Sequence, residues 1–178
     1  MMLANQEYLQ RLRKRQASTS IGASTARRMG PPGTINAARA FLAEVPLNRF
    51  RTRTRAKFQE VLETTTTELV AALPESAQNW GSARKFLNIF LRGCAYNKYL
   101  CEHHNLGPIE PWLEVPLDSH VVKKLKAHAG RGKLPRWNGV IHLTPEESRL
   151  FQARAAQVAL SERVNPVDLD VKYWRADD

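Results

Sequence analysis

The feature that most constrains the fold is a run of apolar residues at helical spacing in the middle of the chain. The turn-forming segment Trp80-Gly81-Ser82 precedes this run, and Ser82 is the expected N-cap of the helix. A helix with so continuous an apolar face needs other elements packed against it. The run therefore predicts a helical core. Its residues are Phe86, Leu87, Phe90, Leu91, Cys94 and Leu100.

Other segments of the chain are also typical of helices. Thr34 is the expected cap of the first of them, and Thr144-Pro145-Glu146-Glu147 is a strong start signal for the last. The four threonines 64–67 are poor helix formers and predict a kink or break. No pair of strands with a hairpin turn is apparent, so the predicted fold class is all-α. The expected helices cover 34–42, 54–73, 118–127 and 144–162.

The N-terminal third of the chain is strongly basic. The net charge is +10, and residues 1–57 carry twelve Lys and Arg against only Glu7 and Glu44. The remaining 121 residues carry fifteen charges of each sign, so the whole excess lies in this third. Such a distribution favours a polyanionic partner over a tail that only aids solubility, because backbone phosphates supply most non-specific affinity. We expect that partner to be DNA.

Residues 1–33 are predicted to be a disordered basic arm. A short helix over 6–16 fits the pattern, but the stretch that follows is rich in Ser, Thr, Gly and Pro, and Met29-Gly30-Pro31-Pro32-Gly33 is incompatible with regular structure. The helical domain is expected to cover 34–178. The Arg- and Ser-rich, acid-poor start leaves a mitochondrial transit peptide open as an alternative.

Several function classes are excluded or disfavoured. No apolar run approaches the roughly 18 residues that span a bilayer, so no membrane association is expected. Cys94 and Cys101 are two helical turns apart, about 10 Å, which is too far for a disulfide. They indicate a reducing compartment, and zinc binding by His103 and His104 is not expected without further ligands. We expect no metal and no cofactor, and a monomer in the cytoplasm, associated with the nucleoid.

Asp118 is the acid whose position is most informative. Pro116 cannot lie inside a helix and biases Val115 towards extended backbone, so Asp118 falls where a helix begins. There its carboxylate either caps the helix or faces a cleft, and the spacing leaves both roles open.

Three segments resemble the helix-hairpin-helix DNA glycosylases, most closely the archaeal-type 8-oxoguanine DNA glycosylases. The lysine-containing helix of that family resembles residues 83–90, its aspartate segment resembles 114–121, and its Pro, Leu-Asp and Trp ending resembles 166–174. The matches occur in the same order and span about residues 79–174. Residues 1–57 match no pattern of the family.

The resemblance implies a compact helical domain of the glycosylase type and a base-excision repair enzyme that removes an oxidised purine such as 8-oxoguanine. It implies that Asp118 and Lys85 are catalytic: the aspartate stabilises positive charge on the sugar or activates a nucleophile. The lysine attacks C1′ and forms a Schiff base, which permits strand cleavage. The damaged base must first leave the duplex stack.

The resemblance also implies a base pocket and a surface for the DNA backbone. Asp170, Trp174 and Trp80 are the candidates for the pocket, although Asp170 could instead be a surface acid paired with Lys172 or Arg175. The stretch 120–136 has six cations and no acid, and is either a phosphate-binding loop or a solvated one. Its candidate backbone contacts are Lys123, Lys124, Arg131, Lys133 and Arg136.

The sequence departs from the family at two points. The expected hairpin has one glycine, Gly81, where the common pattern has two, and one alignment places the family lysine nearer Gln78 than Lys85. Lys85 is therefore either the nucleophile or a solvated helix lysine. The alternatives to a glycosylase with lyase activity are a glycosylase that uses water, a non-catalytic nucleic-acid-binding protein that keeps the glycosylase fold, and a small basic accessory or scaffold protein.

Overall fold

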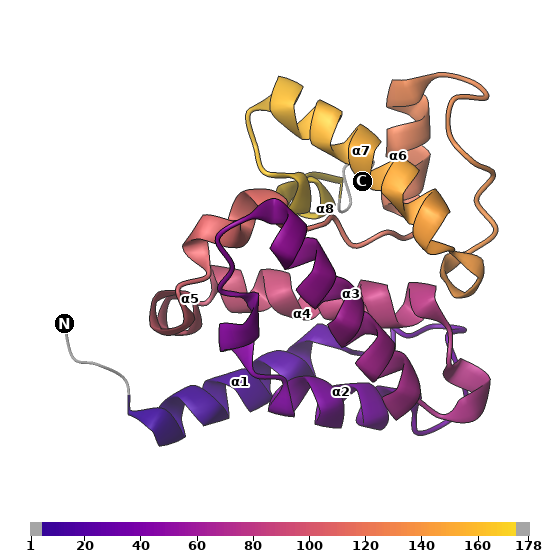
Figure 1. Ribbon diagram of the computed structural model, residues 1–178. Helices are drawn as coiled ribbons and strands as arrows, with labels where there is room; N and C mark the ends of the chain where they lie inside the picture. The colour runs from indigo at the N-terminus through magenta and orange to yellow at the C-terminus, as the bar shows by residue number, and fades with distance from the viewer. Residues whose placement is uncertain (1–4, 174–178) are drawn as a thin grey trace.

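The computed structural model describes residues 5–173, which form helices and connecting segments with no β-strand among them (Figure 1). The all-α prediction is confirmed for this part of the chain. The α-helices are α1 (Gln6–Ser20), α2 (Thr34–Glu44), α3 (Arg55–Ala72), α4 (Trp80–Tyr96), α5 (Lys98–His104), α6 (Ser119–Ala129), α7 (Pro145–Glu162) and α8 (Leu169–Tyr173). The 3-10 helices are η1 (Leu47–Phe50), η2 (Glu75–Ala77), η3 (Gly107–Trp112), η4 (Val140–His142) and η5 (Pro166–Asp168).

The helices form two lobes with separate apolar cores. The larger lobe contains α1 to α5, and its buried cluster includes Phe58, Phe86 and Phe90. The smaller lobe contains α6 to α8, drawn in orange and yellow in Figure 1, with Phe151 and Leu125 in its cluster. The extended segment 113–118 crosses from one lobe to the other. A seam therefore runs between the lobes.

Helix α4 is the centre of the larger lobe. It contacts α1, α2, α3 and α5, which explains why its apolar pattern is the most continuous in the sequence. Its N-cap is Asn79, whose Oδ1 accepts from the Ser82 backbone N–H at 2.9 Å, so the prediction of Ser82 as the cap is wrong. Gly81 is required by close packing, because a Cβ there would lie 1.9 Å from the Val140 carbonyl oxygen of η4.

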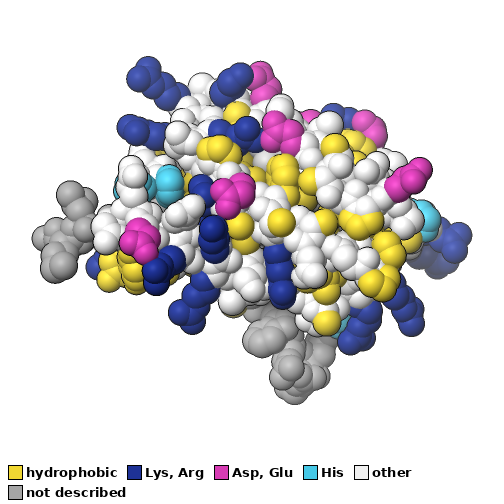
Figure 2. Space-filling model, turned by 90° about the horizontal axis from the view of Figure 1, so that it is seen from below, with side chains coloured by type: hydrophobic (Ala, Val, Ile, Leu, Met, Phe, Trp, Pro, Cys, Tyr) yellow, Lys and Arg dark blue, Asp and Glu magenta, His cyan; other side chains and the backbone are white. Residues whose placement is uncertain are grey.

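The expectation of a disordered arm is wrong for residues 5–33. Helix α1 packs on α2 and α4, and apolar residues along this segment are buried in the larger core, including Leu9, Ala17, Ile21 and Met29. Its cations Arg11, Lys14 and Arg15 are exposed, whereas Arg13 is half-buried and pairs with Glu44 at 3.6 Å. Figure 2 shows Lys and Arg spread over one face of the molecule with acidic side chains among them. Much of the basic excess therefore belongs to a folded surface.

Two local predictions about threonines are also wrong. Helix α3 continues without a break through 64–67, because each threonine hydroxyl donates to the carbonyl four residues earlier, at 2.8–3.1 Å. This local bonding satisfies the hydroxyls inside the helix. The N-cap of α2 is Gly33 and not Thr34, whose hydroxyl instead donates to the Pro31 carbonyl at 2.8 Å.

Candidate functional site

A hollow of about 730 Å³ opens at the seam between the lobes. We call it the Lys85 hollow. Residues from α4, α6 and α8 line it, together with the end of α1 and the turn that follows. Five of the residues predicted for the site meet here although they are distant in sequence: Lys85, Asp118, Lys123, Lys124 and Asp170.

Lys85 is partly buried, which contradicts the solvated alternative. Its Nζ donates to the Thr25 backbone carbonyl at 3.2 Å. Burial lowers the pKa of Lys85 below its ordinary value of 10.5, and the Asp118 carboxylate opposes that change. A larger fraction of this amine is therefore neutral near pH 7 than for a lysine in water, and only the neutral amine is nucleophilic.

Asp118 caps α6 and also lines the Lys85 hollow. Its Oδ1 accepts from the backbone N–H groups of His120 and Val121, both at 2.9 Å, while Oδ2 takes no part in the cap. The two roles left open by the sequence are thus compatible. The cap fixes the carboxylate at the head of the helix, on the side where Lys85 lies.

Asp170 reaches the same hollow from α8. It forms an ion pair with Arg92 of α4, whereas Lys172 pairs with Glu162, so the alternative in which Asp170 pairs with Lys172 is wrong. Arg175, the other partner considered, lies outside the described residues. Beside them the Tyr96 hydroxyl donates to Asp168. The pKa of Tyr96 is raised, mainly by burial and to a smaller extent by this hydrogen bond.

Sequence reasoning missed several residues of the hollow. Ile89, Arg92 and Tyr96 follow Lys85 at intervals of four, seven and eleven residues, so helical periodicity alone places them on its face of α4. Thr25 could not have been found in the same way, because its stretch was expected to be disordered, and the short helix expected over 6–16, which ends at Gln16, was not expected to pack on the domain.

Other predicted site residues lie elsewhere. Trp80 does not reach the Lys85 hollow: its indole N–H donates to Glu63 at 2.8 Å and the Arg84 guanidinium lies 4.7 Å from its ring centre. Arg131, Lys133 and Arg136 are exposed in the loop 130–139 and do not line the hollow. Trp174 lies outside the described residues.

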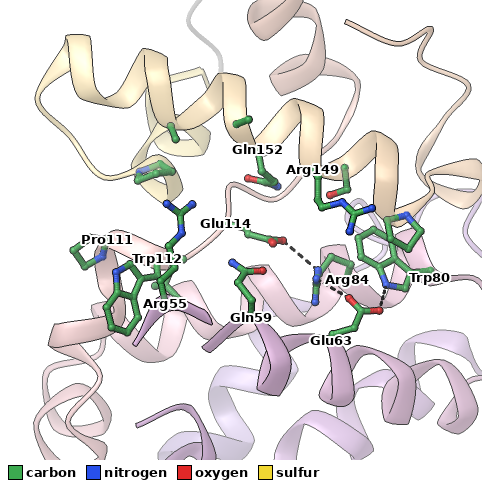
Figure 3. A pocket seen from close by; sticks show the side chains of 16 residues that line it. Arg55, Gln59, Glu63, Trp80, Arg84, Pro111, Trp112, Glu114, Arg149 and Gln152 are labelled. Atoms are coloured by element: carbon green, nitrogen blue, oxygen red, sulfur yellow. Dashed lines mark hydrogen bonds and ion pairs between the residues drawn. The ribbon is translucent and has the colours of Figure 1, made fainter. Parts of the chain in front are cut away.

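A buried ionic network holds the seam together (Figure 3). Arg84 of α4, only 6% exposed, donates to Glu63 at 2.9 Å and to Thr66 at 2.7 Å. Its Nε lies 3.1 Å from the Oε2 atom of Glu114, which also accepts from Asn88 at 3.0 Å. Since Glu114 is four residues before Asp118, the network fixes the aspartate segment against the helix that carries Lys85.

A second link joins the smaller lobe to the same segment. Gln152 of α7 accepts from the Val115 backbone N–H at 3.1 Å and donates to the Val115 carbonyl at 2.8 Å. This side chain satisfies both backbone groups of a buried, extended residue, as a neighbouring strand would. The backbone before Asp118 is therefore bonded on the α7 side as well.

The described residues include no group of three or more His, Cys, Asp or Glu side chains arranged to hold a metal ion.

Burial raises the pKa of the Cys94 thiol, so this cysteine is a core residue with little thiolate at neutral pH. Within residues 5–173, no helix is both long enough and apolar enough to span a bilayer.

Comparison of the chain with known protein families, curated proteins and solved structures finds no match.

Proposed function

We propose that the protein is a DNA glycosylase with lyase activity that removes an oxidised purine of the 8-oxoguanine type. The observation that carries the proposal is that the Lys85 amine and the Asp118 carboxylate line one hollow, at the seam of two helical lobes. A volume of about 730 Å³ is within the range of about 300–1,000 Å³ for small-molecule sites, which is ample for an extruded base.

The chemistry requires a neutral amine and a negative group near the sugar. In the proposed reaction the C1′–N bond breaks, and its electron pair leaves with the base, which takes up a proton. The Lys85 nitrogen bonds to C1′ and loses a proton. The C1′–O4′ bond then opens, O4′ is protonated, and an iminium ion remains. The partly buried Lys85 and the Asp118 carboxylate, held by its cap, suit these roles.

DNA binding in this proposal involves the cations at the edge of the hollow. Lys123 and Lys124 lie on α6 directly after the Asp118 cap and line the same opening. Phosphates beside an extruded nucleotide would lie against such side chains. The exposed cations of the 130–139 loop extend this surface, with Arg131, Lys133 and Arg136 as further phosphate contacts.

The test is borohydride trapping on a duplex that contains 8-oxoguanine. The wild-type protein is expected to form a covalent adduct, and Lys85→Ala is expected to form none. Lys98→Ala is the matched control, because Lys98 is an exposed lysine of α5 outside the hollow. An adduct that persists in Lys85→Ala, or is absent from the wild type on every oxidised purine tested, would refute the lyase proposal.

A non-catalytic nucleic-acid-binding protein is the second candidate. The observation in its favour is that Asp118 caps a helix and Asp170 is neutralised by Arg92, so both acids already have structural roles. This candidate predicts tight binding to DNA with no base release. Incubation with the 8-oxoguanine duplex followed by hot alkali separates the two, because base release leaves a site that alkali cleaves.

A further inference from the structure

A second cavity, of about 570 Å³, lies on a different face of α4 and shares no lining residue with the Lys85 hollow. We call it the Arg84 cavity (Figure 3). Its walls come from both lobes: α3, α4 and η3 on one side, and α7 on the other. A cavity of this size, between two lobes, is typical of a small-molecule site.

One wall of the Arg84 cavity is a fixed polar surface. The Glu63–Arg84–Glu114 network forms it, and in Figure 3 the rings of Trp80 and Trp112 lie at opposite sides of the space. The ion pair with Arg84 and the hydrogen bond from Asn88 both involve Oε2 of Glu114, so Oε1 is outside the network. The surface presents a carboxylate acceptor and aromatic rings that are already held in place.

The α3 side of the cavity also carries polar groups outside the network. Arg55 and Gln59 of α3 line the cavity, point into it in Figure 3, and form no hydrogen bond or ion pair with another described residue. The lining residues carry three cations, Arg55, Arg84 and Arg149, against the two carboxylates of the network, which gives a net charge of +1.

We propose that the Arg84 cavity binds a nucleotide. The base lies against Trp112, its edge contacts Gln59 and Glu114, and its phosphate contacts Arg55. Aromatic faces combined with arginine are the usual means of holding an unpaired nucleotide. The carboxylate accepts hydrogen bonds only, so bases with an exocyclic amine are favoured over thymine. A free nucleotide and an unpaired nucleotide of a strand both carry this chemistry.

The test measures quenching of tryptophan fluorescence in the full chain by dAMP, dTMP and single-stranded dA6. We expect saturable quenching, with dAMP binding more tightly than dTMP. Arg55→Ala is expected to weaken dAMP binding by about tenfold, which corresponds to about 1.4 kcal/mol, and Gln59→Ala by a few-fold. Arg53→Ala is the matched control and should bind as the wild type, because this exposed arginine lies outside the cavity. Tighter binding of dA6 than of dAMP identifies a strand as the source, and the reverse identifies a free nucleotide.

Two results would overturn the proposal: no saturable binding of any probe, or wild-type affinity in both Arg55→Ala and Gln59→Ala. Wild-type affinity in both of these variants, together with loss of binding in Lys85→Ala, would place the nucleotide in the Lys85 hollow. Arg55 is exposed and Gln59 is half-buried near the start of α3, and neither belongs to an apolar core, so their substitution should not unfold the protein. Borohydride trapping by Arg55→Ala stays at the wild-type level in the proposed arrangement, so failure of this site and failure of the glycosylase proposal give different results.

Discussion

Arg84 and Lys85 are consecutive cations on one helix, and their surroundings differ sharply. Arg84 has three oxygen-bearing partners, Glu63, Thr66 and Glu114, and is almost fully buried. Lys85 donates one hydrogen bond, to a backbone carbonyl, and faces a hollow that also contains a carboxylate. A buried cation with its charge fully matched supports a structure. A partly buried cation with its charge incompletely matched has a lowered pKa and is available for chemistry.

Removing each charge in turn tests this difference between Arg84 and Lys85 most directly. We expect Arg84→Met to lower the free energy of unfolding by about 3–5 kcal/mol, because the carboxylates of Glu63 and Glu114 lose their cation. Lys85→Met should change it by less than about 1 kcal/mol, since burial disfavours the charged lysine. Urea unfolding followed by circular dichroism measures both. Equal losses of unfolding free energy in the two variants would show that the two cations contribute equally to stability.

A smaller loss of unfolding free energy is expected when the Gln152 link between the lobes is removed. Gln152→Ala removes both hydrogen bonds to the Val115 backbone and should cost about 1–3 kcal/mol in unfolding free energy. Gln157→Ala is the control on the same helix, because Gln157 is exposed and within residues 5–173 only accepts from Arg154 at 2.8 Å, and it should cost less than about 0.5 kcal/mol. Similar values for the two variants would argue that the Gln152 bonds contribute nothing to the seam.

The pH dependence of borohydride trapping tests the lowered pKa of the Lys85 amine. The rate should rise with pH through a midpoint below 10.5, because burial lowers the pKa of the amine. Asp118→Asn removes the charge that opposes this shift, so the midpoint should move to still lower pH even as the rate falls. Asparagine caps helices as well as aspartate does, so α6 is retained. A midpoint that is unchanged in Asp118→Asn would exclude charge coupling between the two residues.

The smallest expected effect is on DNA binding. It distinguishes the cations that line the Lys85 hollow from those of the loop 130–139. Lys123→Ala should weaken binding to duplex DNA a few-fold and reduce the slope of log affinity against log salt by about 0.9, as loss of one phosphate contact requires. Arg131→Ala, outside the hollow, should reduce adduct formation less than Lys123→Ala does. Fluorescence anisotropy at several salt concentrations, together with trapping, measures both. A larger loss of adduct in Arg131→Ala would assign the DNA-facing surface to the loop.

Helical periodicity and caps predicted much of the fold. The helix start at Thr144 and the start of the α6 helix at Asp118 are local signals, and both occur as expected, with Thr144 and Asp118 as the N-caps. The disorder expected of the arm was wrong for residues 5–33 because glycine and proline around Met29 mark a turn, which the packing of Ile21 and Met29 holds in place. Tertiary burial of this kind has no signal in local composition.

The site was predictable in part for a similar reason. Lys85 and Asp118 were found by resemblance, and Arg92 follows from the helical repeat. The Trp80 assignment failed because its position in the sequence does not reveal the carboxylate of Glu63, seventeen residues earlier, that its indole N–H contacts. The Thr25 carbonyl could not be found at all, since a backbone acceptor has no residue signature.

That carbonyl has a practical consequence for handling the protein. A version shortened to begin at Thr34 would remove α1 and the turn after it, and with them one wall of the Lys85 hollow and the sole hydrogen-bond acceptor of Lys85 within residues 5–173. It would also remove Leu9, Ala17, Ile21 and Met29 from the larger core, so the remaining helices would lose stability as well. Trimming the beginning of the chain would thus disturb the surroundings of an amine more than fifty residues later.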